Sequence, residues 1–145
     1  MNEQLVLGLS LKEALEKEDF FISSSNLDAV TLLDNTDRWA SGVLLLVGPK
    51  GSGKTHLSTV WSKENKAKHV NPETVLREME NGLDHEFVCV EDIDFIEKAE
   101  RQKKLKIEEG IFHLINSIGS RGGNLLISSR IMPNALSIDI KDLES

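Results

Sequence analysis

Short apolar runs alternate with amphipathic segments along the 145 residues of the chain. Continuous apolar runs at 43–47 and 87–90, and the segment 124–129 around Leu125, Leu126 and Ile127, are typical of strands buried on both faces, and 67–70 predicts a weaker strand. Apolar residues at helical spacing predict helices near 26–34, 56–61, 72–80 and 107–118. For the first helix, either Leu27, Val30 and Leu33 or Ala29 and Leu33 could form the apolar stripe. This alternation predicts an α/β fold with a parallel sheet and helices on both faces.

The loop after the first apolar run has the composition of a phosphate-binding P-loop. Its residues are Gly48, Pro49, Lys50, Gly51, Ser52, Gly53, Lys54 and Thr55. Glycines let successive backbone N–H groups face phosphate oxygens at a helix N-terminus. Lys54 would bring a positive charge to the β- and γ-phosphates, and the Thr55 hydroxyl is suited to Mg²⁺. The flanking strand and helix make a chance Gly-rich turn a poor alternative, so the sequence predicts binding of a nucleoside di- or triphosphate.

Two acids follow the second apolar run directly, as in a Walker B strand. Glu91 would lie where the acid that organises Mg²⁺ belongs, and Asp92 where the acid that positions water belongs. The common order is Asp then Glu, so the reversed order favours nucleotide binding over fast hydrolysis. Alternatively, the two acids cap the segment that follows, and Asp94 is expected to be a cap or a surface residue.

Other polar residues give weaker indications. Ser129, at the end of the last apolar run, could sense a γ-phosphate, although serine is common at strand ends. His69 is expected to flank a loop, and no two of the four histidines have metal-ligand spacing. The single cysteine, Cys89, lies in a strand-like run and is expected to be part of the core.

Composition limits the classes of function. The net charge is −7, from 17 Lys and Arg against 24 Asp and Glu, which argues against broad electrostatic binding of nucleic acid and favours protein partners. No apolar run approaches the length of a membrane span, and the N-terminus lacks the basic start of a secretion signal. One cysteine cannot form an internal disulfide, so a cytoplasmic location is expected.

These motifs together resemble the nucleotide-binding domain of the bacterial replication initiator DnaA, an AAA+ protein. The resemblance is closer to the short DnaA-related regulators of the Hda family, in their alphaproteobacterial form. It covers nearly the whole chain: segments 18–26, 44–57, 90–94, 112–116 and 125–130, and Pro133. It implies that the ligand is ATP or ADP together with Mg²⁺. It also implies that His56 joins the P-loop residues in binding the nucleotide, and that Thr55, Glu91 and Asp92 lie on the side of the metal. It also implies a sheet order of 5-1-4-3-2 in the family's strand numbering.

The N-terminal segment, residues 1–10, resembles the peptide by which Hda binds the DNA sliding clamp. Gln4, Leu5, Leu7 and Leu9 would make this contact, with alternate apolar side chains entering pockets on the clamp. The alternative is a flexible tail. Residues 11–145 would then form the P-loop domain.

The sequence departs from the family pattern at Ser145, where an Arg finger, a further strand and a helical lid would follow. We therefore expect a domain that is incomplete at its C-terminus, with a central sheet edge exposed beside the P-loop strand. The chain would be either a fragment or a degenerate relative. Without the finger, which contributes roughly 10³–10⁵ in rate, the family's catalytic stimulation should fail. The chain itself is expected to be at most a weak ATPase.

The resemblance implies a regulator of chromosomal replication initiation that, with the sliding clamp, promotes ATP hydrolysis by DnaA. Such a protein would meet DNA only indirectly, would not bind membranes and could form a homo-oligomer. Two rival functions stay open. One is a DnaA- or helicase-loader-type ATPase that assembles on DNA, and the other is a small P-loop kinase, for which the chain lacks a cluster of Arg residues.

Overall fold

The computed structural model describes residues 21–23, 26–39, 42–49, 53–94 and 99–131. Five parallel strands form one sheet in the order β1-β2-β5-β4-β3. Their bounds are β1 Phe21–Ser23, β2 Val43–Val47, β3 Lys68–Val70, β4 Phe87–Val90 and β5 Asn124–Ser129. The predicted strands are confirmed, and β2-β5-β4-β3 reproduces the 1-4-3-2 part of the expected order.

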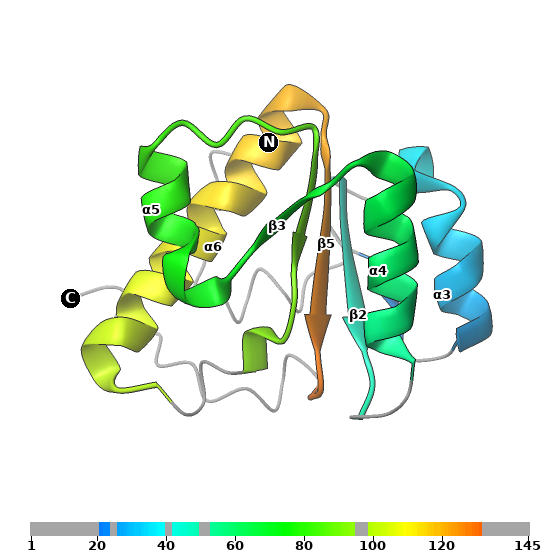
Figure 1. Cartoon of the computed structure of the whole chain (residues 1–145), viewed down its shortest axis with the longest axis horizontal. Helices are drawn as coiled ribbons and strands as arrows, with labels where there is room; N and C mark the ends of the chain where they lie inside the picture. Colours follow the sequence, from blue (N-terminus) through cyan, green and yellow to red (C-terminus); the bar gives the residue numbers. More distant parts are fainter. Residues whose placement is uncertain (1–20, 24–25, 40–41, 50–52, 95–98, 132–145) are drawn as a thin grey trace.

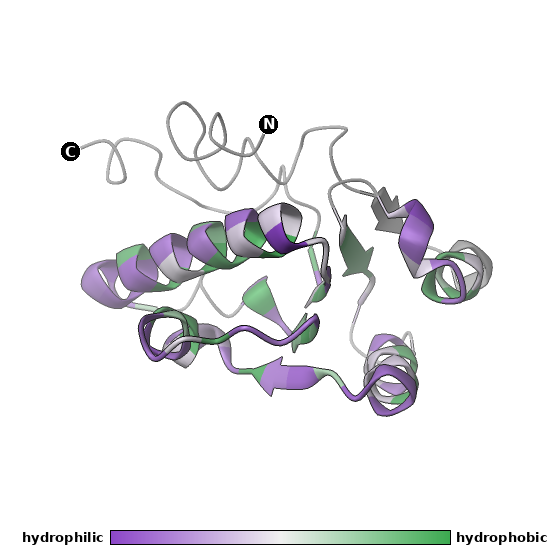
Figure 2. Ribbon diagram, turned by 90° about the horizontal axis from the view of Figure 1, so that it is seen from above, coloured by the Kyte–Doolittle hydropathy of each residue, from purple (hydrophilic) through white to green (hydrophobic). Residues whose placement is uncertain are grey.

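Helices cover both faces of the sheet, as the sequence predicted (Figure 1). They are α3 Asn26–Leu33, α4 Lys54–Asn65, α5 Val75–Glu80 and α6 Arg101–Arg121, with 3-10 turns η1 Thr36–Arg38 and η3 Pro72–Thr74. Helices α5 and α6 lie on one face and α3 and α4 on the other, a separation that is also visible from above (Figure 2). The charged run 101–106 forms the first turns of α6. Among the described helices, none has the length and hydrophobicity to cross a bilayer.

Strand β2 shows why the apolar runs are continuous. Val43, Leu45 and Val47 belong to the core under α5 and α6, whereas Leu44 and Leu46 belong to the core under α3 and α4. Because successive side chains point to opposite faces, a strand covered on both faces must be apolar at every position. The polar residues that a ligand needs are therefore confined to the strand ends.

The stripe that α3 presents to the sheet is the second of the two predicted. Ala29 is buried against the α3–α4 core and Leu33 packs partly against it, whereas Val30 is 44 % exposed. Helix α4 approaches the same core through Trp61, whose ring stacks on Trp39 with the centroids 5.4 Å apart. This pair fixes the end of α4 over the sheet.

The expectation of an exposed edge beside the P-loop strand is wrong. Strand β1 pairs with that edge of β2, with Phe21 opposite Leu44 and Ser23 opposite Leu46. The sequence pattern predicted no strand at Phe21–Ser23. A three-residue parallel strand satisfies the backbone N–H and C=O groups that the edge would otherwise expose.

Candidate functional site

The carboxyl ends of three neighbouring strands meet at one level of the sheet. Val47, the last residue of β2, is in register with Ser129 of β5, and Val90 of β4 is in register with Ile127. The N–H of Gly48 donates a hydrogen bond of 3.1 Å to the carbonyl oxygen of Ser129. The P-loop therefore begins with its backbone tied to the strand beside it, where an open α/β sheet binds its ligands.

The P-loop leads directly into α4. Gly53 has φ +95°, in the left-handed region that favours glycine, and its carbonyl accepts the N–H of Leu57. Lys54, at the first position of the helix, is 9 % exposed, and its Nζ lies 3.4 Å from the carbonyl oxygen of Pro49. The ammonium group is thus folded back over the loop. Thr55 and His56 are exposed at the same helix end, and Lys50, Gly51 and Ser52 lie outside the described residues.

The two Walker B acids face different surroundings. Glu91 is partly buried, with its Oε1 atom 3.2 Å from the Ser58 hydroxyl of α4 and 3.7 Å from Nδ1 of His69. Asp92 is exposed and has φ +57°, a conformation that aspartate tolerates better than most residues. Its backbone N–H donates to the Ser128 hydroxyl at 2.9 Å, which ties the turn after β4 to β5.

Ser129, the predicted sensor residue, is fully buried. Its hydroxyl donates to the carbonyl oxygen of Ile131 at 2.7 Å and accepts from the N–H of Ile131 at 3.2 Å. These bonds shape the turn that leaves β5. A sensor role would require the hydroxyl to exchange them for a phosphate oxygen, and it stays a prediction.

Asp94 was expected to be a cap or a surface residue, and it does not lie at the surface. It is 5 % exposed, and its carboxylate accepts the backbone N–H of Arg130 at 2.9 Å and Nε of the Arg130 guanidinium at 2.7 Å. Burial alone would raise the pKa of the carboxyl, but the hydrogen bonds and positive charge of Arg130 outweigh it and hold the pKa below its usual value. The pair joins the segment after β4 to the end of β5.

Several residues that shape this site were not among the candidates predicted from the sequence. Ser58 could have been found, because Lys54, Ser58, Trp61 and Ser62 recur at the i, i+4, i+7, i+8 spacing of one helix face, and all four are buried. His69 lies in β3, the weak strand predicted at 67–70, and its position directly opposite Cys89 was not predictable from local patterns. The contacts of Ser128 and Arg130 join residues 36 positions apart in the chain, beyond the reach of local patterns.

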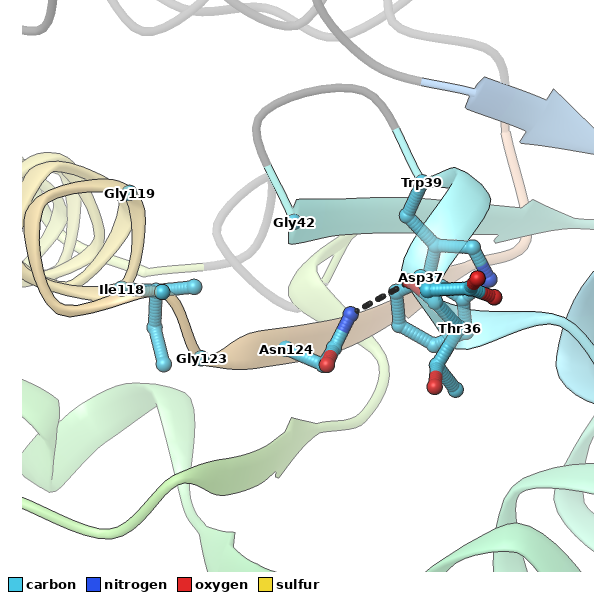
Figure 3. Close-up of a pocket in the computed structure, with 9 residues that line it drawn as sticks. Thr36, Asp37, Trp39, Gly42, Ile118, Gly119, Gly123 and Asn124 are labelled. Atoms are coloured by element: carbon cyan, nitrogen blue, oxygen red, sulfur yellow. Dashed lines mark hydrogen bonds between the residues drawn. The ribbon is translucent and has the colours of Figure 1, made fainter.

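A hollow of about 290 Å³ lies at the opposite end of the sheet (Figure 3). Gly42 precedes β2 here and Gly123 precedes β5, and the Asn124 amide donates to the carbonyl oxygen of Thr36 at 2.8 Å. Asp37 is the one acidic or basic residue of its lining. Glycines make up four of its nine lining residues, but no lysine or arginine lines it, so this hollow lacks the positive charge of a phosphate site.

No protein-family model matches the chain. The chain is 30 % identical, over 158 residues, to a curated Haemophilus influenzae protein whose description reads "Uncharacterized protein". The match covers the whole of this chain but 65 % of that relative, so the chain spans slightly less than two thirds of its length.

Solved structures show the fold more clearly. The chain superposes on AMPPCP-bound DnaA from Aquifex aeolicus with a TM-score of 0.60 and 14 % identity, over 93 % of this chain and 46 % of that one. It also superposes on a DNA replication initiation factor, with a TM-score of 0.57 and 17 % identity over 81 % and 42 % of the two chains. A third similar structure is the replication initiator DnaA bound to AMPPCP and single-stranded DNA. The TM-score is 0.56 and the identity 14 %, over 93 % of this chain and 46 % of that one. The fold is therefore the DnaA-like AAA+ fold.

We expect the Asp94–Arg130 pair to make stability depend on pH. Because the folded-state pKa of Asp94 lies below its unfolded value of about 3.9, the pair stabilises the fold above about pH 4. That contribution is lost as the pH falls through the folded-state pKa. Asp94→Asn should therefore lower the free energy of unfolding most near pH 6, with the deficit shrinking toward pH 3, as measured by urea denaturation. Asp84→Asn, at an exposed acid, is the control, and a deficit for Asp94→Asn that is constant with pH would contradict the assignment.

Proposed function

We propose that the chain binds ATP or ADP together with Mg²⁺ at the carboxyl ends of β2, β4 and β5. The observation that carries this proposal is the P-loop sequence lying between β2 and α4 of a DnaA-like sheet, with the buried Lys54 folded over its loop. A lysine at this position is suited to replace its contact with the Pro49 carbonyl by a stronger, charge-assisted contact to phosphate.

The residues present fit such a ligand. Backbone N–H groups of the loop and of the first turn of α4 can cradle the phosphates. Among the described residues other than its chain neighbours, none has an atom within 4 Å of the position of a Gly53 Cβ. Thr55 and Asp92 are exposed and carry oxygen ligands of the kind Mg²⁺ prefers. Glu91 would have to exchange its contact with Ser58 to join them. Asp92 would position the attacking water, and Ser129 would sense the γ-phosphate.

At the level of the cell, we propose a regulator of replication initiation of the Hda type. The DnaA-like fold supports a replication-related AAA+ role, and the segment from Gln4 to Leu9, which lies outside the described residues, supports docking on the sliding clamp. The protein would then promote ATP hydrolysis by DnaA rather than act chiefly as an enzyme itself.

A second candidate is a DnaA- or loader-type ATPase that assembles on DNA. One of the similar structures is a DnaA bound to single-stranded DNA, which favours this alternative. The net charge of −7 speaks against it, because DNA binding usually depends on basic surfaces. ATP-dependent assembly on single-stranded DNA would favour the loader-type function, whereas clamp binding without such assembly would favour the Hda-type function.

Replacing Lys54 by Ala tests the nucleotide site. Loss of a charged contact to phosphate should weaken binding of Mg·ADP by roughly 10- to 100-fold, as measured by isothermal titration calorimetry. Lys63→Ala, at an exposed lysine in the last turn of the same helix, should leave affinity unchanged. Unchanged affinity of Lys54→Ala, with a normal melting curve, would refute the P-loop assignment.

The partner proposal is tested by the double variant Gln4→Ala, Leu5→Ala. We expect wild-type protein to bind purified sliding clamp and the double variant to lose that binding while it retains nucleotide affinity, because the peptide precedes the folded domain. The double variant Lys12→Ala, Glu13→Ala is a matched control just outside the peptide. Equal clamp binding by all three proteins, or by none, would exclude the N-terminal peptide as a clamp ligand.

A further inference from the structure

Three potential metal ligands meet on the α4 face of the sheet, beside the proposed nucleotide site. Strands β3 and β4 pair in parallel with His69 opposite Cys89, so the two side chains lie on the same face. Glu91 follows Cys89 by two residues and shares that face. One donor atom from each of the three residues lies within 4.8 Å of the other two.

The three donors differ in chemistry and exposure. Cys89 is fully buried, while the side chains of His69 and Glu91 are 50 % and 24 % exposed. A cation could thus reach the cluster from the solvent side and find the thiol at its inner end. The imidazole Nδ1 and the carboxylate Oε1 are already 3.7 Å apart. The bond lengths of tetrahedral zinc place ligand atoms roughly 3.3–3.7 Å from one another, so this pair is already near the required spacing, and the thiol lies within 4.8 Å of both.

Helix α4 brings two hydroxyl groups to the cluster, although its Trp61 belongs to the same buried core as Cys89. Ser58 lies 3.2 Å from the Glu91 carboxylate. Ser62 is 5 % exposed, and its hydroxyl lies against the Cys89 thiol and has no hydrogen-bond partner of normal geometry. A buried hydroxyl in this position is costly in an apolar contact but can support a thiolate ligand.

The Cys89 thiol is not an independent reactive group. Burial, with a smaller contribution from the charge of Glu91, raises its pKa to about 12, so it is protonated at neutral pH and a poor nucleophile. A thiol is nevertheless deprotonated when a cation of the zinc type coordinates it. The geometry, which places this thiol within 4.8 Å of an imidazole nitrogen and a carboxylate oxygen, gives the donor set of a zinc-type site.

We propose that His69, Cys89 and Glu91 form a three-ligand site for a zinc-type divalent cation, with a fourth position open to water. Thiolate and imidazole ligands favour Zn²⁺ or Co²⁺ over Mg²⁺, which prefers an all-oxygen shell. The site therefore selects a different cation from the one that accompanies a nucleotide.

Glu91 belongs to both sites. A cation held by His69 and Cys89 would fix the Glu91 carboxylate on the β3 side, away from Mg²⁺ at the P-loop. This competition rests on the proposed nucleotide function. One equivalent of zinc should weaken Mg·ADP binding by the wild-type protein and should leave Mg·ADP binding by Cys89→Ser unchanged. Equal Mg·ADP affinity with and without zinc would refute the competition.

Cobalt spectroscopy tests the site without any nucleotide. Because Cys89 is the only cysteine in the chain, a thiolate-to-Co²⁺ charge-transfer band reports on this residue alone. We expect wild-type protein to show the band at one equivalent of Co²⁺ and to lose it when Zn²⁺ is added. Cys89→Ser should abolish the band, and His69→Asn should weaken zinc binding by at least the roughly 10–100-fold that loss of an outer-shell partner causes.

The controls separate metal binding from unfolding and from nucleotide binding. His69 is half-exposed, so His69→Asn should retain the wild-type melting temperature even if Cys89→Ser does not. His85→Asn, at an exposed histidine before β4, should bind zinc like wild type. Absence of the charge-transfer band in wild type, or zinc affinity unchanged in His69→Asn, would overturn the site. Because this experiment contains no nucleotide, its failure is distinguishable from failure of the proposed P-loop function.

Discussion

Parallel pairing of β2, β5 and β4 is the constraint on which the site depends. The pairing brings Gly48, Glu91 and Ser129 together at the carboxyl ends of the strands, although they are up to 81 residues apart in the sequence. Both faces of these strands are buried, so their interiors must be apolar and their polar chemistry is confined to the ends. The Gly48–Ser129 backbone bond then fixes where the P-loop leaves the sheet.

Helix α4 links the proposed phosphate site to the metal cluster. Its first turn presents Lys54 and Thr55 at the strand ends, and one turn later Ser58 contacts Glu91. Its last buried serine, Ser62, then lies against Cys89. A single buried helix face thus lies against both arrangements of ligands, and Glu91 is the group that they would share.

The sequence predicted most of this architecture because the signals are local. Buried strands, a P-loop and a Walker B pair each occupy a few consecutive residues. Contacts between distant segments were not predictable in the same way: β1 on the edge of β2, Asp94 with Arg130, and His69 opposite Cys89 all depend on strand register. Histidine spacing in the sequence even argued against a metal cluster, because its ligands come from two strands and from different residue types.

The central claim is that a nucleotide binds at the carboxyl ends of the strands, and amide chemical-shift mapping tests this claim most directly. Titration of ¹⁵N-labelled protein with Mg·ADP should move the resonances of Gly48, Gly53 to Thr55 and Asp92 more than any others in the described part of the chain. Shifts confined to the opposite end, around Gly42 and Asn124, or no shifts at saturating Mg·ADP, would contradict the claim.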